Sequence, residues 1–456
     1  MTVLIPIPDV PGYYVDLFYS MGKALKKNNF TIVFVVTSPY YPGNRKVDLA
    51  EVGTTYYFNE YLQNARQNNN RTIQPSGNGN FWSSYSTFVR QSYFYGSAKN
   101  KFSEYPILHQ FIEEIFTTHT DIVLVISELI SNSFLYTIYN SAKSRSIPHL
   151  CYSASRIPGF FNIFLDDVVT IPLINRSHQV VDHDSKKGIP EYMNNSRFGG
   201  VFDKVSNPWG FVKEVKNFLL AKNYPSWEIG RSKNYVFISY SKFFKRRLFD
   251  FYLSKFHRIF SKDFSHLSNK TLIIYPLHFR PEASTTVQAK YYEDDYELIK
   301  NIAFSLNEDQ YLIVKEHKSN VGNNSLSLYN RIKMLPNTVL LDPYYPLKEN
   351  LSKFDAAICL TSTVGFEALE QGVPVYVLGR VFYENYPGCI RIHSFEQLEQ
   401  CVGGIKKNVA ERKNEITELY HKTNFPGTFN YMNIKCLTKE NIDYLISPIL
   451  AYYGNK

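Results

Sequence analysis

"AAICLTSTVGFEALEQGVPVYVLG", residues 356–379, contains a strand, a helix and a second strand in one short stretch. Apolar runs at 356–360 and 373–378 predict the strands, and the spacing of apolar residues in 364–371 predicts a short helix between them. Two strands joined by one helix predict parallel strands with a right-handed crossover. The polar residues 361–363 then follow the first strand, where ligands bind in sheets of this kind.

The alternation of strands and helices extends over both halves of the chain. In the second half we expect further strands at 271–275, 311–315 and 338–341, with helices at 294–306, 326–334 and 347–354. In the first half we expect strands at 2–7, 31–37, 121–126 and 149–152, with helices at 13–27, 108–118 and 131–143. Residues 40–105 predict loops and helical pieces, and residues 153–235 predict an irregular segment.

These patterns predict an α/β protein with two Rossmann-like domains that face a cleft. We expect a first domain at 1–265, a second at 266–430, and a helix within 431–456 that packs back onto the first domain. The length of 456 residues and the hydrophobic content of 44% are sufficient for two cores.

Composition narrows the class of protein and of ligand. The excess of 50 basic over 41 acidic residues favours an anionic partner. The five cysteines form no C-x-x-C pair, so neither a zinc site nor a disulfide framework is expected. The chain starts with a strand-like segment and has no run of ~18 apolar residues, so we expect a soluble, cytoplasmic protein.

Polar side chains follow the strands of the second domain at the point where each strand ends. Because the carboxyl ends of parallel strands meet at one edge of a sheet, these side chains are expected to share a pocket. They are His278, Arg280 and Glu282 after the first strand, Lys315 and His317 after the second, and Ser362, Thr363 and Glu367 after the fourth. A simpler interpretation remains for the last group, in which Ser362 or Thr363 caps a helix and Glu367 is solvated.

Three of these segments together resemble a known family. "PLHFRPEAST" at 276–285, "VKEH" at 314–317 and "TSTVGFEALEQGVPVYVLG" at 361–379 are similar to the bacterial capsule polysaccharide biosynthesis proteins. That family includes retaining β-Kdo transferases that use CMP-Kdo and have the two-domain GT-B fold. Family members usually carry His-Pro where this chain has His317-Lys318, and commonly Gln where it has Arg280.

The resemblance implies a role for each matching residue. His317, Ser362 and Thr363 would hold the phosphate and ribose of a nucleotide sugar, and Glu282 would lie near the base or the transferred sugar. The positive groups nearby suit a donor that carries both a phosphate and a carboxylate. No metal ion or other cofactor is expected, because GT-B enzymes generally need none and no Asp-x-Asp lies near these strands.

Catalytic groups are expected in the first domain, because the acceptor must meet the donor across the cleft. Glu128 follows the predicted strand 121–126. Asp166 and Asp167 lie further along the chain, after the predicted strand 149–152. Retaining transfer can use a carboxylate nucleophile with a second acid/base. We therefore assign Asp166 or Asp167 as nucleophile and Glu128 as acid/base, against the alternative that all three are surface acids.

Residues 241–262 form a basic stretch in which seven Lys and Arg residues alternate with Phe, Leu and Ile. The stretch predicts either a solvated helix between domains or a helix that contacts the surface of the inner membrane. Nucleic acid is not an expected partner, because no DNA- or RNA-binding module is recognisable.

The function predicted from the sequence is that of a glycosyltransferase. It would transfer a sugar, an ulosonic acid such as Kdo, from a CMP-activated donor to a glycan or glycolipid acceptor of a capsule or lipopolysaccharide. Two alternatives stay open at this point. One is a transferase of the same fold that uses a UDP- or GDP-hexose, and the other is a non-catalytic partner in polysaccharide export.

Overall fold

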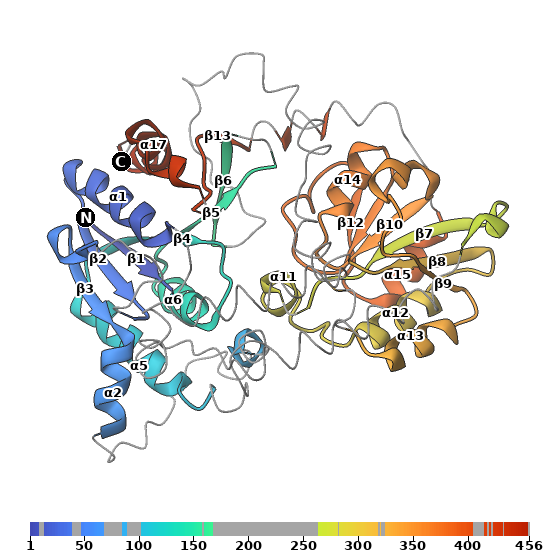
Figure 1. Cartoon of the computed structure of the whole chain (residues 1–456), viewed down its shortest axis with the longest axis horizontal. Coiled ribbons are helices and arrows are strands. Elements are labelled where there is room, and N and C mark those ends of the chain that lie inside the picture. The colour runs from blue at the N-terminus through green and yellow to red at the C-terminus, as the bar shows by residue number, and fades with distance from the viewer. Residues whose placement is uncertain are drawn as a thin grey trace, which may run out of the picture. The chain divides into compact units, whose positions relative to one another are not determined.

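The computed structural model of this chain separates into two α/β units, each with its own sheet (Figure 1). Unit 1 contains the described residues of 1–166 and 423–454, and unit 2 those of 263–420. The structure describes residues 1–8, 13–38, 47–67, 84–88, 102–156, 159–166, 263–280, 282–317, 320, 324–404, 415–416, 419–420, 423–431 and 433–454.

Unit 1 is built on a mostly parallel sheet, whose described strands have the order β13-β6-β5-β4-β1-β2-β3. The strands are β1 (Thr2–Ile7), β2 (Thr31–Val36), β3 (Thr54–Tyr57), β4 (Ile122–Glu128), β5 (His149–Ala154), β6 (Phe160–Leu165) and β13 (Phe425–Pro426). Its helices are α1 (Tyr14–Lys27), α2 (Phe58–Gln67), α5 (Tyr105–Thr118), α6 (Ser133–Lys143) and α17 (Lys439–Gly454), with 3-10 turns η1 (Leu49–Glu51) and η8 (Ile434–Leu437). The parallel part runs 3-2-1-4-5, which is the Rossmann order.

Unit 2 repeats this order with a sheet that is parallel throughout its described strands, β12-β11-β10-β7-β8-β9. The strands are β7 (Thr271–Pro276), β8 (Gln310–Lys315), β9 (Thr338–Leu341), β10 (Ala356–Cys359), β11 (Val375–Val377) and β12 (Cys389–Arg391). The helices are α11 (Ala283–Thr286), α12 (Asp295–Phe304), α13 (Leu326–Lys333), α14 (Val364–Glu370) and α15 (Phe395–Val402), with 3-10 turns η5 (Ser265–Leu267) and η7 (Lys348–Lys353). The α/β class with two Rossmann-like units is confirmed.

Two strands lie in segments for which the sequence predicted loops. The edge strand β3 is short and half-exposed, so its residues carry little hydrophobic pattern, and it forms by parallel pairing with β2. β6 pairs antiparallel with β5, and its apolar residues contribute to the core. Both segments are rich in residues that favour strands, so the sequence carried a local signal for β3 and β6 that the loop prediction missed.

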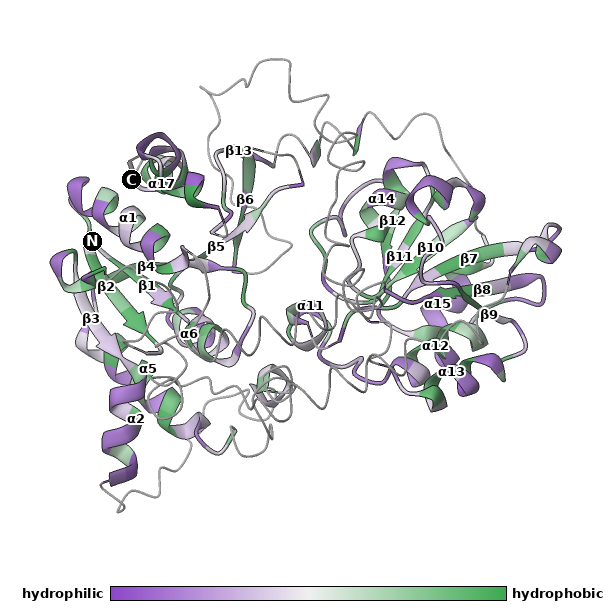
Figure 2. Cartoon of the chain, in the orientation of Figure 1, coloured by the Kyte–Doolittle hydropathy of each residue, from purple (hydrophilic) through white to green (hydrophobic). Residues whose placement is uncertain are grey.

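Each unit has an apolar core against its sheet. In unit 1, α1 buries one stripe, which includes Leu17, Phe18, Met21 and Leu25 at helical spacing, against β1 and β2. In unit 2, α12 buries Leu298, Ile299 and Ile302 against the sheet in the same way. Figure 2 shows the strands of both sheets largely in green, with purple on the outer parts of the helices.

The C-terminal segment completes unit 1. The chain rejoins that unit at Thr423, earlier than the boundary at 431 that the sequence suggested, and α17 packs beside α1 (Figure 1). The buried hydroxyl of Tyr152 on β5 donates a hydrogen bond of 2.7 Å to the carbonyl of Leu445 on α17, and Tyr453 donates one of 2.7 Å to Val123 on β4. Among the described helices, none is long and apolar enough to cross a membrane.

The packing of α17 leads to a stability prediction. Leu445 is fully buried in the core of unit 1, so Leu445→Ala should lower the free energy of unfolding by about 2–5 kcal/mol. Asp443 is exposed on the same helix, and Asp443→Ala should change it by no more than about 0.5 kcal/mol. Urea unfolding followed by hydrogen exchange of peptides from α1 and β1 measures both. Equal stability of the two variants would contradict the docking of α17.

Candidate functional site

The strand order of unit 2 reverses between β7 and β10, and ligands bind outside the carboxyl ends of strands at such a reversal. His278 follows β7 and Thr361 follows β10, so residues far apart in the chain meet here. The imidazole Nε2 of His278 accepts a hydrogen bond of 3.1 Å from the backbone N–H of Thr361 and lies 3.0 Å from the Thr361 hydroxyl. The reversal is therefore closed by a direct contact between the two strand ends.

His278 is a neutral group in this site. It is buried, and burial lowers its pKa to about 3, an effect to which the nearby positive groups Arg280 and His317 add. The backbone N–H of Thr361 can only donate, so Nε2 carries the lone pair and the neutral ring has its proton on Nδ1. His278 thus joins two strand ends without adding a charge at neutral pH.

His317 follows β8 and is exposed, in contrast to His278. Its ring centre lies 6.5 Å from that of Phe279, next to His278 in the chain. The ends of three adjacent strands, β10, β7 and β8, therefore bring Thr361, His278 and His317 together. These three side chains form a cluster of hydrogen-bonding groups, and none of the three is a carboxylate.

Ser362, Thr363 and Glu367 lie at the start of α14. The Ser362 hydroxyl accepts a hydrogen bond of 3.2 Å from the backbone N–H of Val364, as the capping interpretation expected. Thr363 is the N-cap residue and Glu367 is half-buried in the first turn. Gly379 follows β11 and lies directly against Thr361. A Cβ at Gly379 would lie 2.4 Å from Cγ2 of Thr361, so there is no room for a larger residue.

The side chain of Arg280 forms hydrogen bonds with other groups of unit 2. Its Nε donates a hydrogen bond of 2.7 Å to Oδ1 of Asp295, which begins α12, and its Nη2 donates one of 2.6 Å to the carbonyl of Tyr292. Both side chains of the ion pair are largely buried, at 18% and 8% exposure. Burial raises the pKa of Asp295, and Arg280 opposes that rise. Arg280 therefore forms a structural ion pair, and its predicted contact with a ligand stays a prediction.

Glu282 and Lys315 also have structural partners. Glu282 is the N-cap of α11, where its carboxylate accepts a hydrogen bond from the Ser284 hydroxyl (3.1 Å) and its backbone N–H donates to Thr285 Oγ1 (3.2 Å). Lys315 is buried, and its Nζ donates a hydrogen bond of 2.8 Å to the carbonyl of Pro343 in the turn after β9. Both side chains thus contact protein groups, and their predicted ligand contacts stay predictions.

In unit 1 the strand order reverses between β1 and β4, and Glu128 is the last residue of β4. Its carboxylate accepts hydrogen bonds from the hydroxyls of Ser131 (3.1 Å) and Tyr431 (3.3 Å). Tyr14 on α1 is fully buried beside it, and burial followed by the Glu128 charge raises the pKa of its phenol. Glu128 thus occupies in unit 1 the position that the His278 cluster occupies in unit 2.

Asp166 does not share that position. Because β6 runs antiparallel to β5, its end returns to the beginning of β5, where Asp166 accepts a hydrogen bond of 3.1 Å from the backbone N–H of His149. His149 pairs with Val125, and Glu128 lies about 10 Å further along β4. The expected pairing of Asp166 with Glu128 is wrong for this reason. Asp167 lies outside the described residues, as do Lys318 and the basic stretch 241–262.

Sequence reasoning missed Tyr431 as a neighbour of Glu128. Tyr431 belongs to the C-terminal segment, separated from β4 by the whole of unit 2, and no local pattern links it to a strand end. Its only signal in the sequence was its place at the start of the segment that was expected to return to the first domain.

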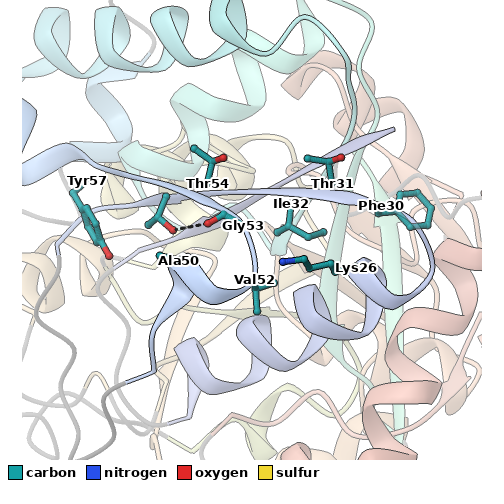
Figure 3. A pocket seen from close by; sticks show the side chains of 10 residues that line it. Lys26, Phe30, Thr31, Ile32, Ala50, Val52, Gly53, Thr54 and Tyr57 are labelled. Atoms are coloured by element: carbon teal, nitrogen blue, oxygen red, sulfur yellow. Dashed lines mark hydrogen bonds between the residues drawn. The ribbon is translucent and has the colours of Figure 1, made fainter.

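A separate cavity of about 640 Å³ lies along β3 and the beginning of β2 (Figure 3). It is lined by Lys26, Phe30, Thr31, Ile32, Ala50, Val52, Gly53, Thr54, Thr55 and Tyr57. The ammonium of Lys26 donates a hydrogen bond of 3.0 Å to the carbonyl of Glu51. None of the candidate residues lines this cavity, and it contains no cluster of titratable groups that would suggest chemistry.

Comparison with known proteins adds a family match. Residues 206–429 match the family described as "Capsule polysaccharide biosynthesis protein", which is just under half of the chain and includes all candidate residues of unit 2. The match confirms the resemblance found in the sequence. No curated protein matches the chain significantly.

Several solved structures are distantly similar. KpsC, a beta Kdo 2,7 transferase of Thermosulfurimonas dismutans, is 15% identical with a TM-score of 0.29, over 69% of this chain and 89% of that one. UDP-GlcNAc 2-epimerase of Neisseria meningitidis is 15% identical with a TM-score of 0.23, over 98% and 100%. The calicheamicin glycosyltransferase CalG4 is 11% identical with a TM-score of 0.27, over 99% and 98%. Similarities this weak do not assign a function.

The structural role of Arg280 can be tested by substitution. Arg280→Ala leaves the buried Asp295 without its partner and should destabilise unit 2 by about 3–5 kcal/mol. The double variant Arg280→Ala/Asp295→Asn should recover part of that loss, because the unpaired charge is gone. Arg331→Ala breaks an exposed ion pair with Glu297 and should cost at most about 1 kcal/mol. Chemical unfolding of the variants measures these effects, and an Arg280→Ala protein as stable as the parent would refute the assignment.

Proposed function

We propose that this chain, whose second unit lies within the match to capsule polysaccharide biosynthesis proteins, is a glycosyltransferase that uses a nucleotide sugar. The observation that carries the proposal is the meeting of His278, His317 and Thr361 at the strand reversal of unit 2. A reversal of this kind is the usual place for a nucleotide in a Rossmann-like sheet.

The chemistry of the cluster suits a phosphate. A phosphate offers only acceptor oxygens at neutral pH, so it needs donors around it. The imidazole of His317 and the hydroxyls of Thr361, Ser362 and Thr363 are side chains that can donate. Arg280 adds positive charge nearby, although its guanidinium is paired with Asp295. This supports a phosphorylated ligand over a neutral sugar.

For the donor we propose a CMP-activated ulosonic acid such as Kdo, with a capsule or lipopolysaccharide glycan as acceptor. The support is the resemblance of the three segments around His278, His317 and Ser362 to that family. A UDP- or GDP-hexose is the alternative donor. The family commonly has Gln where this chain has Arg280. Because Arg280 pairs with Asp295, this difference concerns a structural contact within unit 2.

For the chemistry we propose that the nucleotide phosphate leaves the anomeric carbon when a carboxylate nucleophile attacks it. Glu128 then takes the proton of the acceptor hydroxyl as that oxygen forms its bond to the anomeric carbon and the bond from this carbon to the nucleophile breaks, which frees the carboxylate. A retaining reaction by two displacements needs a second carboxylate as nucleophile. Asp167, outside the described residues, stays the candidate from its segment. We propose that no metal ion takes part. We also propose that residues 241–262 contact the inner membrane peripherally.

The donor can be identified by titration. Calorimetry with CMP, UDP and GDP should show binding of CMP at least about tenfold tighter than of the others, because the family resemblance points to a cytidine donor. Tighter binding of UDP or GDP would replace the ulosonate by a hexose donor. Absence of binding by all three nucleotides would overturn the proposed function and favour the non-catalytic export partner.

The role of Glu128 predicts a separation of catalysis from binding. Glu128→Gln removes the group that takes the proton and should lower the transfer rate by about 10²-fold or more, with nucleotide affinity unchanged. Glu60→Gln, an exposed change in the same unit, should be silent. Transfer assays with and without EDTA measure both points, and EDTA should have no effect. Full activity of Glu128→Gln would remove Glu128 from the mechanism.

A further inference from the structure

Tyr431 is held in place at several points around Glu128. Its backbone carbonyl accepts a hydrogen bond of 2.7 Å from the N–H of Tyr13, which precedes α1. Its ring packs edge-on against Tyr14 at 5.1 Å between centres and against Phe429 at 6.2 Å. Its hydroxyl donates to Oε2 of Glu128 at 3.3 Å. A side chain fixed by both its backbone and its ring presents its hydroxyl in one direction.

The two oxygens of Glu128 have different donors. Ser131, three residues later in the chain, donates to Oε1 at 3.1 Å, and Tyr431 donates to Oε2 from the far end of the chain. Hydrogen bonds that are donated to a carboxylate favour its ionised form and fix its plane. An ionised carboxylate can accept a proton but cannot supply one.

Glu128 also lies beside the buried phenol of Tyr14. Tyr14 is fully buried next to it, and the Glu128 charge is one cause that raises the pKa of the Tyr14 phenol, after burial. The other titratable groups that act on Tyr14 are Tyr431 and Cys151 on β5. The hydroxyls of Ser131 and Tyr431 are two donors that stabilise the anion of Glu128.

We propose that Tyr431 is a positioning residue that holds Glu128 ionised and oriented as a general base. The inference rests on the proposed role of Glu128 and makes it more specific. It also gives the C-terminal segment a function, because this segment supplies part of the site in unit 1 in addition to packing on α1.

The test compares the parent with Tyr431→Phe, which keeps the ring and removes the hydroxyl. Without the donor, Glu128 should bind its proton more tightly, so the acid limb of the pH profile of kcat/KM should move up by about 0.5 pH unit or more. Activity should recover at higher pH, and nucleotide affinity should be unchanged. Carbon-13 NMR of the Glu128 carboxyl should show the same displacement of its titration midpoint without any substrate.

Two further variants make the result decisive. Tyr444→Phe removes an exposed hydroxyl that also donates to a carboxylate at 3.3 Å, that of Glu440 in the same segment, and it should leave the profile unchanged. Ser131→Ala removes the donor to Oε1, so it should move the profile in the same direction as Tyr431→Phe and covers the case in which that variant fails to fold.

The outcomes separate the inference from the proposed function. If Glu128→Gln is inactive while Tyr431→Phe and Ser131→Ala keep the profile and NMR midpoint of the parent, the positioning role is overturned alone. A loss of activity that is equal at every pH, together with lower thermal stability, would assign Tyr431 a purely structural role and overturn the inference too. Full activity of Glu128→Gln would overturn the catalytic role of Glu128 and, with it, the inference.

Discussion

The parallel pairing of β7 with β10 is the constraint on which the candidate site depends. It reverses the strand order of unit 2 and places residues separated by 83 positions in hydrogen-bond contact, from the backbone N–H of Thr361 to Nε2 of His278. The imidazole in that contact is buried, and burial keeps it neutral at pH 7. The close approach of Gly379 to Thr361 keeps the turn after β11 against the same point.

Around this contact, the polar groups at the strand ends divide into two kinds. Arg280, Glu282 and Lys315 hold a helix start, a helix cap and a turn, and their partners are protein groups. His317 and the hydroxyls near α14 lie on the exposed side of the cluster or are half-buried. A buried charge is stable only with a partner, and the charged residues at these strand ends have partners within the protein. The groups that face a ligand are therefore mainly neutral hydrogen-bond donors.

The candidate site of unit 1 also lies at a strand reversal, but it depends on a distant segment of the chain. Its sheet has the same order of parallel strands, but its reversal is completed by a segment that returns after unit 2. α17 covers α1, β13 extends the sheet beyond β6, and Tyr431 reaches Glu128. The site in unit 1 therefore depends on the C-terminal segment, and stability and the orientation of Glu128 are linked through the same residues.

The sequence by itself determined the α/β class, most of the strands and helices, and the cluster of residues after β7, β8 and β10. These follow from local signals, since apolar runs and helical spacing are visible within a few residues. The tertiary structure alone decided that β3 pairs parallel with β2 and β6 antiparallel with β5, that Arg280 pairs with Asp295, and that Tyr431 lies beside Glu128. It also placed Asp166 at the wrong end of β5 for catalysis with Glu128, because the direction of β6 depends on which strand it pairs with. Such pairings join distant parts of the chain, and no local pattern of residues encodes them.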